Sequence, residues 1–227
     1  MNVPADLVGL VRLRAEAMPA KTAFRFVPDG PGGVESLTYE QLAQSSASFG
    51  AWLRTHACRG ERVVIALPPG IGFVRAYFGC LQAGCVAVPV VAPSPRRAIG
   101  AFRAIVEDCA AKTVLLTHGL LESLAVAIAA DPMLSSLHWL EIEAFESAPT
   151  SARSGLDPTA TDPAMIQYTS GSMSTPKGVV VSHGNLLDNV ATIQSALGIT
   201  PDMHAVFWLP PYHDMGLVGG IVHTVHA

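Results

Sequence analysis

A loop rich in hydroxyl groups and glycines is the segment whose residue types are best suited to chemistry. It runs through Thr169, Ser170, Gly171, Ser172, Met173, Ser174, Thr175, Pro176, Lys177 and Gly178. Small residues let the backbone approach an anion closely, backbone amides can form an anion-binding nest, and the hydroxyls and the lysine add donors and positive charge. The loop therefore suits phosphate groups. Its composition is also typical of a plain surface turn, and composition alone favours that second interpretation.

The loop is not a P-loop. The GxxxxGKS or GxxxxGKT pattern is missing, and the residues that follow Lys177 are strand-like. A P-loop instead leads into a helix whose amino terminus faces the phosphate.

His213 is the second candidate for chemistry. A histidine among aromatic residues is more often packed than catalytic, but the adjacent Asp214 could orient its imidazole. His223 and His226 have HxxH spacing but no evident third ligand, so we expect no metal site there. The four cysteines lack metal-type spacing and lie in apolar stretches, so we expect buried, reduced thiols at Cys58, Cys80, Cys85 and Cys109.

Alternating strand and helix patterns must position these residues. The expected strands cover 22–27, 34–38, 62–67, 85–90, 112–117, 137–141, 164–169, 178–182 and 205–209. The expected helices cover 39–56, 71–83, 96–110, 120–130 and 185–197. Thr38 with Gln41 forms a capping box for the first helix, and His183 and Asn185 should cap or orient the last. Short apolar strands between helices predict an α/β fold with largely parallel βαβ sheets.

A polar, proline-rich segment at 146–163 predicts a surface connection between two subdomains. On this interpretation residues 1–145 belong to a first α/β subdomain, and residues 164–227 begin a second one that carries the loop and the His-Asp pair. The chain ends within an apolar stretch, 214–227, that lacks a polar cap. Together with the low charge content, this ending leads us to expect a piece of a larger protein.

Composition excludes several classes of function. The chain has 227 residues, with 14 Lys and Arg against 18 Asp and Glu, so its net charge of 14 − 18 = −4 argues against a nucleic-acid binder. Hydrophobic residues make up 50%, which argues against disorder. No apolar run reaches the roughly 20 residues of a membrane span, and the amino terminus does not read as a secretory signal. We therefore expect a cytoplasmic protein.

Two long motifs resemble those of a known superfamily. The first motif resembles the phosphate-binding signature of the adenylate-forming enzymes. It consists of Tyr168-Thr169-Ser170-Gly171-Ser172, followed by Pro176-Lys177-Gly178-Val179 and by Ser182-His183-x-Asn185-Leu186. The adenylate-forming enzymes include acyl-CoA synthetases, firefly luciferase and peptide-synthetase adenylation domains. The second motif resembles the next signature of the superfamily, in the form found in fatty acyl-AMP ligases. It reads Trp208-Leu209-Pro210-Pro211-Tyr212-His213-Asp214-Met215-Gly216-Leu217. The resemblance covers essentially the whole chain but less than half of a complete member.

The resemblance implies a reaction and a fold, the amino-terminal part of an adenylate-forming enzyme. Members activate a carboxylic acid with ATP and Mg²⁺, and fatty acyl-AMP ligases pass the acyl group from the acyl-adenylate to an acyl carrier protein or a carrier domain of a polyketide or peptide synthase. The implied phosphate-binding residues are Thr169, Ser170, Gly171, Ser172, Ser174 and Lys177. Thr169 would also help to hold Mg²⁺, with an acidic residue beyond this chain. His213 would be catalytic, and His213, Asp214, Met215 and Gly216 would line the acyl and carboxylate pocket.

Met173 departs from the family, which usually has threonine there, because a thioether cannot donate a hydrogen bond to a phosphate oxygen. The family's adenine- and ribose-binding segments, later acidic motif and mobile carboxy-terminal domain are not found, so the fragment alone is expected to be inactive. Two alternatives stay open. One is a piece of an acyl-CoA synthetase, and the other is a non-catalytic binding or scaffold protein that keeps the first part of the fold.

Overall fold

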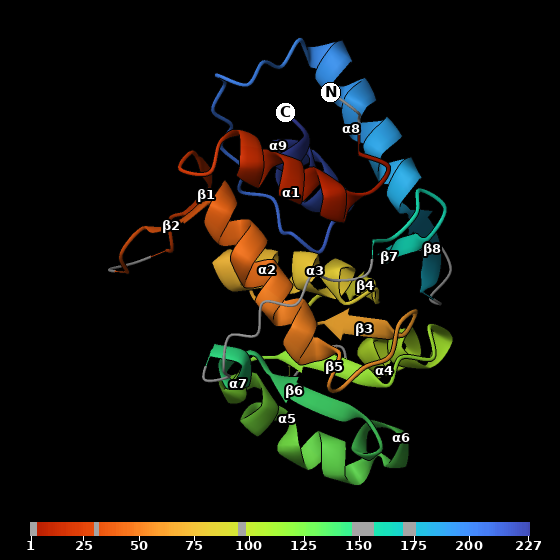
Figure 1. Ribbon diagram of the computed structural model, residues 1–227. Coiled ribbons are helices and arrows are strands. Elements are labelled where there is room, and N and C mark those ends of the chain that lie inside the picture. Colours follow the sequence, from red (N-terminus) through yellow and green to blue (C-terminus); the bar gives the residue numbers. More distant parts are fainter. Residues whose placement is uncertain (1–3, 30–31, 95–98, 147–156, 170–175) are drawn as a thin grey trace.

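A six-stranded sheet forms the centre of the computed structural model, which describes residues 4–29, 32–94, 99–146, 157–169 and 176–227 (Figure 1). The strand order is β6-β5-β3-β4-β7-β8. The strands are β3 (Arg62–Ile65), β4 (Val86–Pro89), β5 (Thr113–Leu116), β6 (His138–Glu141), β7 (Pro163–Thr169) and β8 (Lys177–Ser182). All neighbouring pairs are parallel except β7 and β8, which are antiparallel. The predicted α/β fold with a largely parallel sheet is confirmed.

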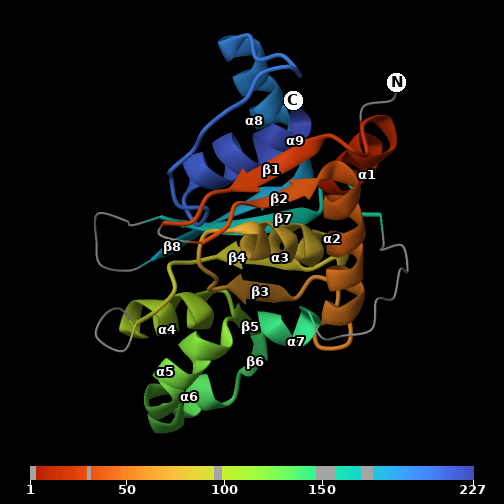
Figure 2. The same cartoon turned by 90° about the vertical axis from the view of Figure 1, so that its left-hand side faces the viewer.

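Helices cover both faces of the sheet because its strands bury side chains on both sides (Figure 2). Val63 and Ile65 pack into one apolar cluster with α2 and α3, and Val64 packs into another with α4. The helices are α1 (Leu7–Ala17), α2 (Tyr39–Leu53), α3 (Ile71–Gln82), α4 (Ile99–Asp108), α5 (His118–Ala130), α6 (Pro132–Ser135), α7 (Ile142–Glu146), α8 (His183–Leu197), the π-helix η1 (Met215–Val222) and α9 (His223–His226).

Two glycines allow α2 and α3 to pack closely. A Cβ on Gly79 would lie 2.4 Å from the Phe49 ring, and one on Gly50 would lie 2.7 Å from the Cβ of Gln82. The capping box predicted for α2 is present, with the Gln41 amide donating to the Thr38 hydroxyl and the Thr38 amide donating to the Gln41 side chain. These contacts hold α2 and α3 together as one helical layer against the sheet.

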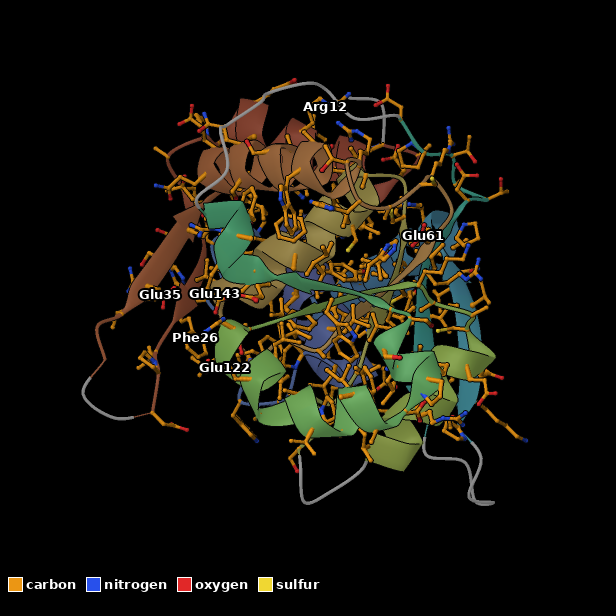
Figure 3. The ribbon with its side chains drawn as sticks, turned by 90° about the horizontal axis from the view of Figure 1, so that it is seen from below. Arg12, Phe26, Glu35, Glu61, Glu122 and Glu143 are labelled. Atoms are coloured by element: carbon orange, nitrogen blue, oxygen red, sulfur yellow. The ribbon has the colours of Figure 1, made fainter. Side chains whose placement is uncertain are left out.

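A small hairpin stands apart from the main sheet. Strands β1 (Thr22–Phe26) and β2 (Glu35–Thr38) pair antiparallel, with Phe26 opposite Glu35. Figure 3 labels both residues and shows the hairpin projecting at one side of the molecule. Both strands agree with the expected ones to within a residue.

Two sequence-based predictions are wrong. Residues 205–209 are not a strand: they have no regular secondary structure, and Val206 and Trp208 are 87% and 86% exposed. An apolar β-rich pattern forms a strand only where another strand can pair with it. Cys58 is exposed, whereas Cys80, Cys85 and Cys109 are buried as expected, and all four thiols are free.

Residues on either side of the predicted connection at 146–163 share one sheet, because β7 pairs with β4. The division into subdomains stays a prediction, and residues 147–156 lie outside the described residues. Within the parts of the chain that the structure describes, no helix is long and apolar enough to cross a membrane.

Candidate functional site

The two ends of the hydroxyl-rich loop lie opposite each other. Thr169 ends β7 and Lys177 begins β8, and the antiparallel register pairs these two residues. Gly178 pairs with Tyr168, and a Cβ on Gly178 would lie 2.8 Å from Ile166 Cγ2 and 3.0 Å from Tyr168 Cζ. The hairpin therefore closes tightly at the base of the loop. The predicted phosphate ligands Ser170, Gly171, Ser172 and Ser174 lie outside the described residues, as does Met173.

The side chains at the base of the loop are exposed and available. Within the described residues, the Lys177 ammonium makes no ion pair and the Thr169 hydroxyl makes no hydrogen bond. A cation and a hydroxyl that are not already engaged can serve an anionic ligand without first breaking a contact. The chemistry of this pair fits a polyphosphate.

Tyr168, the residue before Thr169, connects the end of β7 to helix α4. Its hydroxyl donates a hydrogen bond to the carboxylate of Asp108 at the end of α4. Burial, followed by the hydrogen bond to Asp108, raises the pKa of the Tyr168 phenol, so this group stays protonated. The strand that leads into the loop is thus fixed to a helix.

His213 lies in a compact turn. Its backbone amide donates to the carbonyl of Pro210 at 3.1 Å, and the amide of Leu217 donates to the carbonyl of His213 at 2.8 Å. Gly216 is essential to the turn, because a Cβ at this position would lie 2.2 Å from the Pro210 oxygen. The turn passes directly into the π-helix η1, a rare element that is often found near functional sites.

The imidazole of His213 is exposed and packs against the Tyr212 ring at a centroid distance of 5.1 Å. The predicted orienting role of Asp214 finds no support in its contacts. Its carboxylate accepts a hydrogen bond from the amide of Met215 at 2.7 Å and caps η1. Of the other predicted pocket residues, Met215 is exposed and Gly216 is buried.

Gln167 connects the two motifs. Its side-chain Nε2 donates to the carbonyl of Tyr212 at 3.0 Å, so the residue before His213 is held against the strand that leads to Thr169. Sequence reasoning missed this residue. The available signal was a single amide side chain directly after the apolar run Ala164–Ile166 of the strand.

His183, His223 and His226 pack inside the fold rather than beside His213. Ser182 and Asn185 form a capping box that starts α8, and the buried His183 accepts a hydrogen bond from the amide of Leu7 at 3.3 Å through Nδ1. His223 Nε2 and His226 Nδ1 are buried without partners among the described residues. Burial lowers the pKa of all three histidines. No group of three potential metal ligands occurs in the described part of the chain.

A small cavity of about 120 Å³ is lined by neither Thr169, Lys177 nor His213. Arg59, Asp162, Pro163 and His183 are among the residues that line it. Pro163 begins β7, whereas Thr169 ends it, so the cavity is at the opposite end of the strand from the loop. It does not belong to the candidate site.

Comparison with known proteins shows similarity in both fold and sequence. A fatty acyl-adenylate ligase from Legionella pneumophila, solved in complex with acyl adenylate and pyrophosphate, superposes with a TM-score of 0.87 at 34% identity, covering 98% of this chain and 38% of that one. The fold is therefore that of the amino-terminal region of adenylate-forming enzymes. The sequence matches the family described as AMP-binding enzyme over residues 11–227, and the chain belongs to this family.

The similar curated proteins are fatty acid ligases. The medium-chain fatty acid–acyl-carrier-protein ligase JamA of Moorena producens is 32% identical over 98% of this chain and 38% of its own length. The putative fatty-acid–CoA ligase FadD21 of Mycobacterium tuberculosis is 32% identical over 97% of this chain and 40% of its own length. The chain thus spans about two fifths of the relatives that it matches.

Proposed function

We propose that this chain supplies the phosphate-binding loop and the histidine of a site that activates a fatty acid with ATP, as part of a fatty acyl-AMP ligase. The observation that carries the proposal is the single hydrogen bond from Gln167 to Tyr212, which joins the two motifs at the end of β7. Gln167 and Tyr212 are 45 residues apart in sequence, and the motifs beside them would be unrelated if they lay on different sides of the fold.

In the proposed reaction a carboxylate oxygen of the fatty acid attacks the α-phosphorus of ATP. The bond to the bridging oxygen breaks, and pyrophosphate leaves. Such a reaction depends on the positioning of two anions and on the stabilisation of the phosphate charge that develops. The Lys177 ammonium, the Thr169 hydroxyl and the loop between them would hold the leaving phosphates, and His213 would lie beside the carboxylate.

Mg²⁺ fits one residue of this chain. The hydroxyl of Thr169 is an oxygen ligand of the type that Mg²⁺ accepts, and it has no competing hydrogen bond within the described residues. When bound, the ion would neutralise phosphate charge. Because this hydroxyl is one ligand among six, most of the ligands would be phosphate oxygens, water and residues outside the described part of the chain.

Two variants test the proposed roles by ATP–pyrophosphate exchange, in the complete natural polypeptide that carries this chain. Lys177→Ala should raise the KM for ATP about tenfold, because a charge-assisted contact to phosphate is lost. His213→Ala should lower kcat by about 100-fold with little change in that KM. Lys112→Ala, at an exposed lysine elsewhere on the sheet, is the control. No stimulation of exchange by any fatty acid would refute the proposal.

The acyl acceptor is a separate question. We propose a carrier protein, because the name of JamA states transfer to one and the His-Asp-Met-Gly-Leu wording resembles fatty acyl-AMP ligases. Coenzyme A is the second candidate, which the name of FadD21 favours. Incubation of the acyl-adenylate-forming protein with either acceptor, followed by mass spectrometry of the acylated product, distinguishes the two. A cytoplasmic location stays a prediction.

A further inference from the structure

Gln167 is an unusual residue for its position. It is 7% exposed, and it follows three buried apolar residues of β7, Ala164, Met165 and Ile166. Its Nε2 donates to Tyr212 O at 3.0 Å and more weakly to Tyr168 O at 3.5 Å. Its Oε1 is buried and has no hydrogen-bond partner within the part of the chain that the structure describes.

Stability alone does not explain a glutamine at this position. A buried acceptor without a partner is unfavourable, because folding removes the water that satisfied it. Methionine has nearly the same length and shape and carries no polar group that needs a partner. What glutamine adds is an NH₂ group, and its shorter hydrogen bond is donated to the carbonyl of Tyr212.

The placement of this bond connects the two halves of the site. Gln167 precedes Thr169 by two residues, and Tyr212 precedes His213 by one. Successive residues of a strand point to opposite faces. Gln167 accordingly holds the His213 turn on one face of β7, while Tyr168 binds Asp108 on the other. The base of the loop is fixed from both sides.

We propose that Gln167 is a positioning residue, which sets the distance between the phosphate loop and His213. This inference rests on the proposed function and deepens it. Transfer between a carboxylate and an α-phosphate requires the groups that bind each of them to be held within a fraction of an ångström. The segment from Pro210 to Leu217 is closed by its own hydrogen bonds, so a bond that holds Tyr212 also acts on the adjacent His213.

Amide hydrogen–deuterium exchange on the 227-residue chain tests, without any substrate, whether Gln167 holds the His213 turn in place. Gln167→Met removes the donor and keeps the shape, and Gln167→Glu keeps the shape but places an acceptor against Tyr212 O. In both variants the amides of His213 and Leu217 should exchange about tenfold faster. The melting temperature of Gln167→Met should stay within about 3 °C of wild type. Gln44→Met, at an exposed glutamine of α2, is the matched control and should change neither quantity.

Steady-state kinetics of the complete natural polypeptide test the catalytic part. Gln167→Met should lower kcat for ATP–pyrophosphate exchange about tenfold or more while the KM for ATP changes less than about twofold, because the loop's own contacts remain. If Gln167 had a purely structural role, the variant would have a lower melting temperature and less active protein, and kcat would not fall selectively while the KM for ATP stayed the same.

Each outcome decides a different question. Unchanged exchange at His213 and Leu217 in Gln167→Met would overturn the positioning role and leave the proposed function intact. Faster exchange with an unchanged kcat would overturn it too. A wild-type protein that no fatty acid stimulates would refute the proposed function, whatever the exchange data show. Should Gln167→Glu fail to fold because of its buried charge, Gln167→Met still decides the matter.

Discussion

At the scale of single residues, Gly216 controls the shape of the candidate site. A Cβ there would lie 2.2 Å from the Pro210 oxygen, closer than any real Cβ contact. Gly216→Ala should therefore destabilise the protein by about 1–3 kcal/mol, because the turn must open to admit the methyl group. Urea unfolding monitored by circular dichroism measures this change.

Gly219 provides a matched control within the same π-helix, because its nearest neighbour would be Met215 Cγ at 3.9 Å. Gly219→Ala should change the free energy of unfolding by less than about 0.5 kcal/mol. Equal losses in the two variants would show that the contact with Pro210 does not limit residue 216.

At the scale of elements, the start of α8 depends on Ser182. The hydroxyl of Ser182 accepts a hydrogen bond from the amide of Asn185 at 3.1 Å, and the Asn185 side chain accepts one from the amide of Ser182, also at 3.1 Å. Ser182→Ala should cost about 1 kcal/mol, because the first turn loses a cap. Ser195→Ala, at an exposed serine of the same helix, should be neutral within about 0.5 kcal/mol. Thermal melts of both variants compare them, and similar losses would contradict the capping role.

At the scale of the whole molecule, the buried His183 and His223 and the half-buried His226 predict acid sensitivity. Burial holds the pKa of His183, His223 and His226 below the ordinary value of 6.5. The unfolded chain therefore takes up protons at a pH where the folded chain does not, so stability is full above 6.5 and falls as pH decreases through it. The exposed His118 acts in the opposite direction, because its hydrogen bond to Glu141 raises its pKa.

The melting temperature should decrease as the pH is lowered from about 7.5 to about 5.5. His223→Leu should reduce this dependence, since it removes a buried group that must otherwise stay neutral. His204→Leu, at an exposed histidine, should retain the wild-type dependence. A melting temperature that rises on acidification would contradict the assignment of neutral, buried imidazoles.

The exposed apolar surface of the whole molecule predicts self-association of the chain when it is produced alone. Strand β8 ends the described sheet, and its Val180 is 61% exposed. An open, apolar edge strand is a template for pairing with another chain. Val180→Lys should shift sedimentation velocity profiles toward the monomer, whereas Val126→Lys, at an 85% exposed valine of α5, should not. A wild-type chain that is monomeric at every concentration would contradict this expectation.

The sequence by itself determined most of the strands and helices of the central α/β layers and the residue types of the loop. Local signals suffice for these features: the capping box of Thr38 and Gln41 starts α2, and apolar runs between helices mark the buried parallel strands. Both family motifs are also contiguous in sequence, so they need no tertiary information. The prediction for residues 205–209 failed because a strand exists only when another strand supplies its hydrogen bonds.

Only the tertiary structure decided which distant segments of the chain contact each other. The placement of β7 next to β4, the exposure of Cys58 and the bond from Gln167 to Tyr212 join residues that are distant along the chain. Residue types in one segment carry no record of which other segment will pack against them. The contact between the strand that ends at Thr169 and the turn that carries His213 therefore follows from the packing of the whole chain, because it depends on where two separate segments come together.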